Sequence, residues 1–208
     1  MGPLLFIGYV NDLPSSVSQS EVKQYADDTT LYCVGDSTRD LSMRLNAYLA
    51  GVANWVEKNG LKLNESKTQM LLLSRRKWAK ELENVVVKLN EKEVERSEKV
   101  KLLGVWIDEG LTWKAHIEAV RRKCFRGLAK LRRLRDALPA VTNKNIYNAL
   151  VLPTLDYCCV VWQECGKLLQ QRVERIQNYG MRLICSKPPR TPSESLRKEL
   201  NWMPLTKR

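Results

Sequence analysis

The chain has 208 residues, of which 44% are hydrophobic, so it can fill one large core or two small ones and intrinsic disorder is not expected. Lysine and arginine number 35 against 23 acidic residues, and the formal charge of +12 favours an acidic polymer as partner, with nucleic acid the commonest candidate. The six cysteines form no C-x-x-C pair and His116 is the only histidine, which argues against a structural zinc site.

No apolar run is long enough to span a membrane, and the chain does not open with a basic and then apolar signal sequence. We therefore expect an intracellular protein, the nucleus included, with reduced thiols and no membrane contact.

The first expected helix begins at Pro3 and carries Leu4, Ile7 and Val10 on one face. Asn11-Asp12-Leu13-Pro14 ends it. Because the chain starts in such apolar residues, we expect a partner segment upstream of it in a longer protein.

Two adjacent carboxylates, Asp27 and Asp28, stand in the sequence Tyr25-Ala26-Asp27-Asp28. Like charges at this range repel each other, and a divalent metal ion would relieve that repulsion. The flanking residues 22–26 and 29–34 are typical of two short strands, which predicts a β-hairpin that presents both carboxylates at its tip. A solvated Asp-Asp turn without a metal remains the alternative.

A second helix is expected after Ser37, whose sequence resembles a capping box, and it ends at Asn59-Gly60. The polar turn of residues 61–68 then leads into a strand at 69–73. Lys67 in this turn could neutralise phosphate charge or protonate a leaving group, although a solvated lysine is the simpler interpretation.

Further strands are expected at residues 85–89 and 93–95, joined as a hairpin, and at 102–107, where Gly104 would mark a bulge or a close backbone approach. Together these strands would extend one sheet. Residues 107–113 form the expected boundary between a part based on a sheet and an all-helical part.

From residue 112 the pattern is helical, with an apolar stripe from Trp113 to Leu134 that includes Cys124. Eight basic residues within fifteen follow the opposite face, and without alternating acids they favour binding to a phosphate backbone over a merely solvated face. They are Arg121, Arg122, Lys123, Arg126, Lys130, Arg132, Arg133 and Arg135.

Two more helices are expected, at residues 145–162 with a bend or stop near Pro153, and at 167–185. We expect Cys158 and Cys159 to be core residues of the first of these helices, and His116 to be a packed or capping residue.

Several motifs follow one another along most of the chain: Gly2-Pro3-Leu4-Leu5-Phe6, Asn11-Asp12-Leu13-Pro14, Tyr25-Ala26-Asp27-Asp28-Thr29, residues 61–68, Leu103-Gly104-Val105, Leu111-Thr112-Trp113 with His116-Ile117, Pro153 with Leu155-Asp156-Tyr157, Arg175-Ile176-Gln177-Asn178 and Leu200-Asn201-Trp202. In their order and spacing these motifs resemble the reverse transcriptase of non-LTR retrotransposons, the jockey-like or LINE-type family.

This resemblance implies RNA-directed DNA synthesis, in which Asp27 and Asp28 help to hold two Mg²⁺ ions, or Mn²⁺ as the alternative. It also implies that Lys67 acts on the pyrophosphate leaving group. The implied partners are an RNA template, a DNA primer and deoxynucleoside triphosphates.

The resemblance assigns nucleotide and template contacts to Gly2, Pro3 and Tyr25, and a primer grip to Leu103, Gly104 and Val105. The basic helix would correspond to the thumb, which holds nucleic acid through its phosphates. Its implied contact residues are Arg121, Arg122, Lys123, Arg126, Lys130, Arg132 and Arg133.

The expected fold class is α+β. A partial polymerase palm, an antiparallel sheet backed by helices, would cover residues 1–110, and an all-helical thumb with a truncated connection would cover 111–208.

Family polymerases carry a further catalytic aspartate and the fingers upstream of Gly2, so we expect this chain alone to polymerise little. An endonuclease domain and a cysteine-rich zinc knuckle are also missing from the sequence. One alternative is a non-catalytic nucleic-acid-binding fragment that uses residues 121–135, and another is a basic domain that makes protein contacts through exposed apolar surface.

Overall fold

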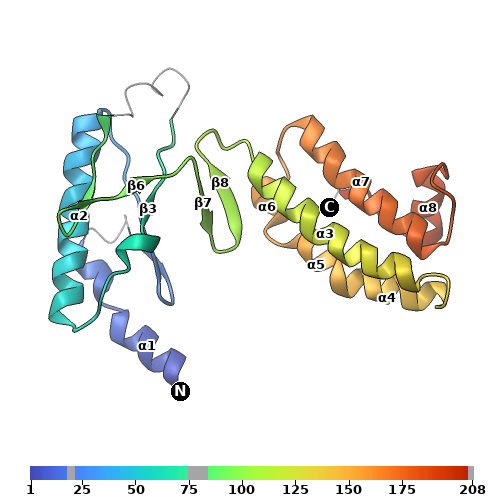
Figure 1. Cartoon of the computed structure of the whole chain (residues 1–208), viewed down its shortest axis with the longest axis horizontal. Coiled ribbons are helices and arrows are strands. Elements are labelled where there is room, and N and C mark those ends of the chain that lie inside the picture. Colours follow the sequence, from blue (N-terminus) through green and yellow to red (C-terminus); the bar gives the residue numbers. More distant parts are fainter. Residues whose placement is uncertain (18–21, 75–83, 206–208) are drawn as a thin grey trace. The chain divides into compact units, whose positions relative to one another are not determined.

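The protein forms two compact units, Met1–Glu98 and Lys99–Arg208, in a computed structural model that describes residues 1–17, 22–74 and 84–205 (Figure 1). Both helices and short strands are present, which confirms the α+β class at this level. The division into a palm over 1–110 and a thumb over 111–208 stays a prediction.

The first unit is built around one long helix. Its elements are α1 (Gly2–Val10), η1 (Leu13–Ser16), β1 (Val22–Tyr25), β2 (Asp28–Leu31), α2 (Thr38–Lys58), η3 (Glu65–Lys67), β3 (Gln69–Met70), β4 (Lys88–Leu89), β5 (Lys92–Glu93) and β6 (Glu95–Arg96).

Helix α2 has the predicted bounds because both of its ends are fixed by local chemistry. The Ser37 hydroxyl accepts a hydrogen bond from the Asp40 amide at 3.1 Å and so satisfies a free N–H of the first turn. At the other end Gly60 takes a φ of 64°, which glycine adopts without strain.

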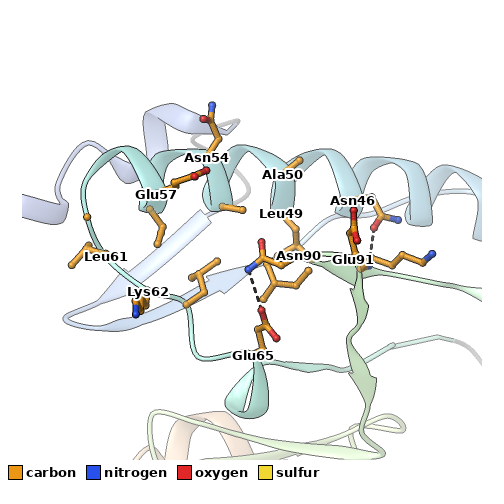
Figure 2. Close-up of a pocket in the computed structure, with 16 residues that line it drawn as sticks. Asn46, Leu49, Ala50, Asn54, Glu57, Leu61, Lys62, Glu65, Asn90 and Glu91 are labelled. Atoms are coloured by element: carbon orange, nitrogen blue, oxygen red, sulfur yellow. Dashed lines mark hydrogen bonds between the residues drawn. The ribbon is translucent and has the colours of Figure 1, made fainter.

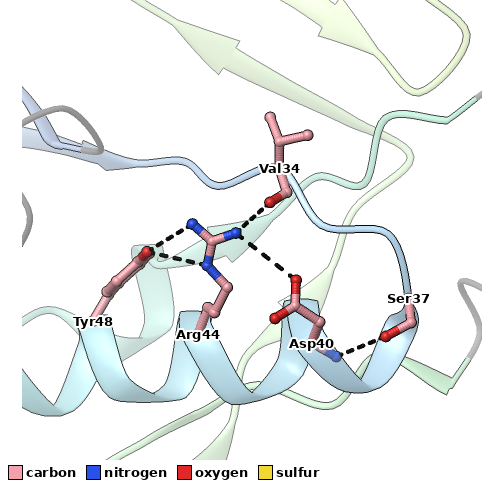
Figure 3. A network of polar contacts seen from close by, with 5 residues as sticks. All are labelled: Val34, Ser37, Asp40, Arg44 and Tyr48. Atoms are coloured by element: carbon pink, nitrogen blue, oxygen red, sulfur yellow. Dashed lines mark hydrogen bonds and ion pairs between the residues drawn. The ribbon is translucent and has the colours of Figure 1, made fainter.

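The chain that leaves β2 is tied to α2 by Arg44 (Figure 3). Its guanidinium donates to the Val34 carbonyl at 2.5 Å and to the Tyr48 hydroxyl at 3.3 Å, and it lies 3.8 Å from the Asp40 carboxylate. These contacts fix the segment between the hairpin and the helix.

Two apolar clusters share α2. Leu72, Val85, Val87, Leu89 and Val94 pack against the face of α2 that carries residues from Leu41 to Ala53. Leu13 joins Val52 and Val56 near its C-terminal end, where Leu31 of β2 packs against the same cluster.

The expected continuous sheet is not found among the described residues. The strands instead form four separate two-stranded sheets, β1–β2, β3–β6, β4–β5 and β7–β8, and β3–β6 is parallel. Strand periodicity in a sequence does not state which strands pair, so short strands could be predicted while their grouping could not.

The second unit comprises a hairpin and a set of helices. Its elements are β7 (Lys99–Leu102), β8 (Val105–Asp108), α3 (Lys114–Leu134), α4 (Ala140–Leu150), α5 (Leu152–Asp156), α6 (Cys159–Trp162), α7 (Lys167–Ile184) and α8 (Ser193–Leu200).

The single strand predicted at residues 102–107 is wrong, because the chain reverses in its middle. Leu103 and Gly104 both have positive φ, 45° and 87°, and they connect β7 to β8 with Leu102 opposite Val105. Such a two-residue turn matches the right-handed twist of the strands that it joins.

The helix predicted at residues 145–162 is three shorter helices. The first break is at Val151, directly before α5, whose first turn contains Pro153. The second break is at Cys158, whose φ is 49°. Consequently Cys158 is exposed, which corrects its expected place in the core, and Cys159 is half-buried.

The core of the second unit lies between α3, α4, α5 and α7. Tyr147 of α4 is 0% exposed, lies against Gly180 of α7, and its ring centroid is 5.0 Å from that of Trp202. His116 is 3% exposed, and its Nδ1 accepts from the Trp106 amide at 3.3 Å, so it is a packed residue as expected. Among the described residues no helix is both long and apolar enough for a membrane span.

Candidate functional site

The two carboxylates lie at the tip of a tight antiparallel hairpin. Tyr25 pairs with Asp28, so only Ala26 and Asp27 form the loop. Ala26 takes a φ of 54°, the left-handed conformation that such a turn requires. The predicted hairpin is therefore confirmed, with the refinement that Asp28 begins β2 and only Asp27 lies in the bend.

The hairpin is anchored at its base and open at its tip. Val22 is 4% exposed, and its partner across the ladder, Leu31, packs against the Leu13 cluster. Tyr25, Asp27 and Asp28 are all exposed. This arrangement holds the backbone beneath the carboxylates while leaving their oxygens free to meet a ligand.

Carboxylate oxygens are the ligands that hard divalent cations prefer. Two adjacent aspartates at a tight turn are suited to such an ion, although they leave most coordination positions to other donors. Within the ranges that the structure describes, no group of three or more histidine, cysteine or acidic side chains gathers as a ready metal site.

The other residues predicted for this site lie on separate elements of the first unit. Gly2 and Pro3 begin α1 and are exposed. Lys67 is the last residue of η3 and is also exposed, and among the described ion pairs none joins it to Asp27 or Asp28. The assignment of these three residues to the site stays a prediction.

A groove of about 870 Å³ lies between α2, the segment that follows it and the β4–β5 hairpin (Figure 2). Leu49 and Leu63 line it together with polar groups, and the Asn90 amide donates to Glu65 across one side at 3.1 Å. Its lining contains none of the residues predicted from the sequence to bind metal or nucleotide.

In the second unit, the turn at Leu103 and Gly104 is held by a residue that is distant in sequence. The Tyr157 hydroxyl donates to the Leu103 carbonyl at 2.6 Å. A Cβ on Gly104 would lie 3.3 Å from Cε1 of the same ring, so glycine permits the close approach. The sequence offered Tyr157 only as part of a family motif, because 54 positions separate it from the turn.

The basic residues predicted on α3 all face solvent. They are Arg121, Arg122, Lys123, Arg126, Lys130, Arg132 and Arg133. Arg121 pairs with Glu118 at 2.9 Å, and in the part of the chain that the structure describes the other six make no ion pair. The opposite face of the helix is buried, with Cys124, Leu128 and Leu131 at 0% exposure.

Comparison with known proteins relates these features to a family. Residues 1–107 match the family described as reverse transcriptase (RNA-dependent DNA polymerase). No solved structure matches the chain.

Curated relatives come from insect mobile elements. The chain is 27% identical over 216 residues to the probable RNA-directed DNA polymerase from transposon BS of Drosophila melanogaster, covering 97% of this chain and 23% of that protein. It is 25% identical over 219 residues to a retrovirus-related Pol polyprotein from type-1 retrotransposable element R1 of Nasonia vitripennis, covering 98% of this chain and 52% of the relative.

The RNA-directed DNA polymerase from mobile element jockey of Drosophila melanogaster is 24% identical over 198 residues, which are 90% of this chain and 21% of that protein. The chain thus spans between about a fifth and about half of the length of these relatives. Because the family match takes in more than half of its 208 residues, the chain belongs to the reverse transcriptase family, as a relative of the jockey-like, LINE-type enzymes that its motifs predicted.

Proposed function

We propose that this chain is part of an RNA-directed DNA polymerase of a non-LTR mobile element, contributing carboxylates of the metal site and the surface that holds primer and template. In this assignment residues 1–110 are the C-terminal part of the palm and residues 111–208 are the thumb and its connection. The observation that carries the proposal is the anchored hairpin that exposes Asp27 and Asp28, within the segment that matches the family.

Reverse transcriptases generally use divalent metal ions, and we assign Mg²⁺, with Mn²⁺ as substitute, to Asp27 and Asp28. When bound, paired metal ions stabilise both the attacking and the leaving oxygens of nucleotidyl transfer. The contribution of this chain is to hold two carboxylates next to each other at a tight turn. Because the two negative charges repel each other, a bound cation stabilises the pair relative to the same pair without a cation.

The remaining residues have roles in holding the substrates. Gly2, Pro3 and Tyr25 would contact the template and the incoming deoxynucleoside triphosphate, and Lys67 would neutralise or protonate the pyrophosphate leaving group. The turn of Leu103, Gly104 and Val105 would grip the primer. Tyr157 supports this last role because it fixes the backbone of the turn through the Leu103 carbonyl.

The basic face of α3 would hold an RNA template and a DNA primer through their phosphates. Within the described part of the chain only Arg121 of these exposed cations forms an ion pair, with Glu118, and the charge of the others is therefore available to an external polyanion. Contacts of this kind position a duplex without reading its sequence.

Metal binding at the hairpin can be measured by NMR on the isotopically labelled chain. We expect Mn²⁺ to broaden the amide signals of residues 25–29 selectively, and Mg²⁺ to compete for the same site. Asp27→Asn and Asp28→Asn should each abolish this broadening, whereas Asp36→Asn, which alters another exposed aspartate nearby in sequence, should not. Equal broadening in all variants would refute the assignment of the metal to this pair.

Primer extension on an RNA template addresses catalysis by this chain alone. We expect few nucleotides to be incorporated, because two carboxylates provide only part of the metal site that the family uses. Incorporation of many nucleotides that is lost in Asp27→Asn would overturn this expectation while supporting the role of the carboxylate.

The second candidate function is nucleic-acid binding without catalysis, which the unpaired cations of α3 favour on their own. Binding to a primer–template duplex should then weaken steeply with salt. A plot of the logarithm of the binding constant against the logarithm of the salt concentration should fall with a slope of about −0.9 for each phosphate contacted. Absent binding, or binding that salt does not weaken, would exclude this function.

A further inference from the structure

An exposed aromatic ring stands among the cations of α3. Phe125 is 41% exposed although the neighbouring Cys124 and Leu128 are fully buried. Tyr179 of α7 lies beside it, with ring centroids 6.1 Å apart and planes inclined at 32°. A pair of aromatic rings at a surface costs free energy in water, and it can be stabilised by a flat apolar ligand.

The two helices that carry this pair, α3 and α7, run side by side (Figure 1). Glu118 precedes Phe125 by seven residues, and Arg172 precedes Tyr179 by the same number. Arg172 lies near enough to Glu118 to contribute to lowering the pKa of that carboxyl, after the larger effect of its hydrogen bond from Arg121. The contact between α3 and α7 therefore places arginines one to two helical turns before the aromatic pair.

The charge along the surface between α3 and α7 is strongly positive. Arg122 lies one turn before Phe125 on α3, and Arg175 lies one turn before Tyr179 on α7, both exposed. The only acid among them, Glu118, is already engaged by Arg121 at 2.9 Å. The Arg121 guanidinium is also 5.8 Å from the centroid of the Phe125 ring, so aromatic and cationic groups form one continuous surface.

We propose that Phe125 and Tyr179 form a stacking platform for an unpaired base of single-stranded nucleic acid, whose phosphates bind Arg122, Arg172 and Arg175. This inference rests on the proposed binding of nucleic acid by the second unit and adds a site within it. A single strand is the ligand because its bases expose their flat faces, whereas in a duplex these faces are covered by neighbouring base pairs. Stacking on the platform does not read the sugar, so RNA and DNA strands both satisfy it.

The test measures binding of fluorescently labelled twelve-residue strands, oligo-dT and oligo-rU, to the full chain by anisotropy over a series of salt concentrations. Phe125→Leu should weaken binding about tenfold, the loss expected for one stacked base, without changing the salt slope. Phe125→Trp should keep wild-type affinity because it keeps the flat ring. Arg122→Gln should reduce the slope of the logarithm of the binding constant against the logarithm of the salt concentration by about 0.7, the value for one phosphate of a single strand.

A change in the ligand separates stacking from nonspecific damage to the protein. On a strand whose nucleotides lack bases, wild type and Phe125→Leu should bind equally, because there is no base to stack. Val141→Ala, which alters another exposed apolar residue of this unit, is the matched control and should behave as wild type on both strands.

The outcomes distinguish this inference from the function on which it rests. If the wild-type chain binds no strand, the proposed nucleic-acid binding fails and the platform fails with it. If the wild-type chain binds with a salt dependence but Phe125→Leu binds as well as wild type on strands that have bases, only the platform is refuted.

Discussion

The close contact between α4 and α7 at Gly180 predicts that one added methyl group has a large effect on stability. Gly180 of α7 lies against Tyr147, and a Cβ at position 180 would lie 2.3 Å from Cε2 and 2.8 Å from Cδ2 of that ring. Favourable contacts between carbon atoms are about 3.5–4.0 Å. Tyr147 is 0% exposed and also packs against Trp202, so the ring has no free space into which it can turn.

Gly180→Ala should therefore destabilise the second unit. Alanine favours a helix by about 1 kcal/mol over glycine, but overpacking of a filled core costs about 1–3 kcal/mol and more where the neighbour is rigid. At a separation of 2.3 Å we expect the steric term to dominate, with a net loss of about 2 kcal/mol. For a unit of roughly 100 residues this lowers the Tm by about 8–16 °C.

Thermal unfolding followed by near-ultraviolet circular dichroism reports the loss of fixed packing around the aromatic side chains, Tyr147 and Trp202 among them. Gly8→Ala is the matched control, because Gly8 also lies within a helix and nothing lies within 4 Å of its Cβ position. Tyr147→Leu combined with Gly180→Ala should recover part of the loss, since the smaller side chain makes room for the methyl group. A Gly180→Ala variant as stable as wild type would refute the argument.

Three further predictions concern single side chains. Burial lowers the pKa of His116 below its ordinary value of 6.5, so the unfolded state binds a proton on this imidazole more readily than the folded state does. The contribution of His116 to the free energy of unfolding should therefore be fully present above pH 6.5 and be lost as the pH falls below that value. In His116→Asn the Tm should depend less on pH below 6.5 than it does in wild type. Burial raises the pKa of the Cys124 thiol to about 12, so this thiol should not react at neutral pH while the protein is folded. A maleimide should then modify the exposed Cys158 in the folded protein and Cys124 only after unfolding, which peptide mass mapping can measure. Tyr157→Phe removes the hydrogen bond to the Leu103 carbonyl, and amide exchange in residues 99–108 should become faster by about fivefold, the equivalent of 1 kcal/mol.

The helices could be predicted from the sequence because their signals are local. Ser37 and Gly60 fix the ends of α2, and the apolar stripe that includes Cys124 fixes the face that α3 buries. Each signal lies within a few residues of its effect, and the bounds predicted for α2, α3 and α7 agree with the structure to within about two residues, the usual scatter at helix ends. The helix predicted at residues 145–162 does not, because its break at Cys158 carries no such local signal.

Turns inside apolar runs were harder to predict. Leu103 takes a positive φ although it is not glycine, and the residues on both sides of it are as apolar as a continuous strand would be. Cys158, which also takes a positive φ, interrupts the predicted helix between α5 and α6 without a proline or glycine at its position. In both places contacts from distant residues, such as the Tyr157 hydrogen bond, stabilise a conformation that local propensity does not favour.

The same distinction applies to the candidate sites. The hairpin that exposes Asp27 and Asp28 could be predicted because the two residues are neighbours in the chain, whereas the metal ion assigned to them stays a proposal. The pairing of Phe125 with Tyr179 could not be found, because 54 positions separate the two rings and each has the appearance of an ordinary core residue in its own helical pattern.

The hairpin of Asp27 and Asp28 and the surface between α3 and α7 share one property. Each exposes charged or aromatic side chains that other parts of the chain could have paired or buried. The hairpin could place its acids apart on opposite faces of a strand, and instead it holds both at one exposed tip. The surface between α3 and α7 could pair its arginines with acids and bury Phe125, and instead it pairs one arginine and leaves the ring 41% exposed. In the roles proposed for them, the carboxylates, the cations and the ring are already in place before a metal ion or a strand binds, which lowers the free-energy cost of binding.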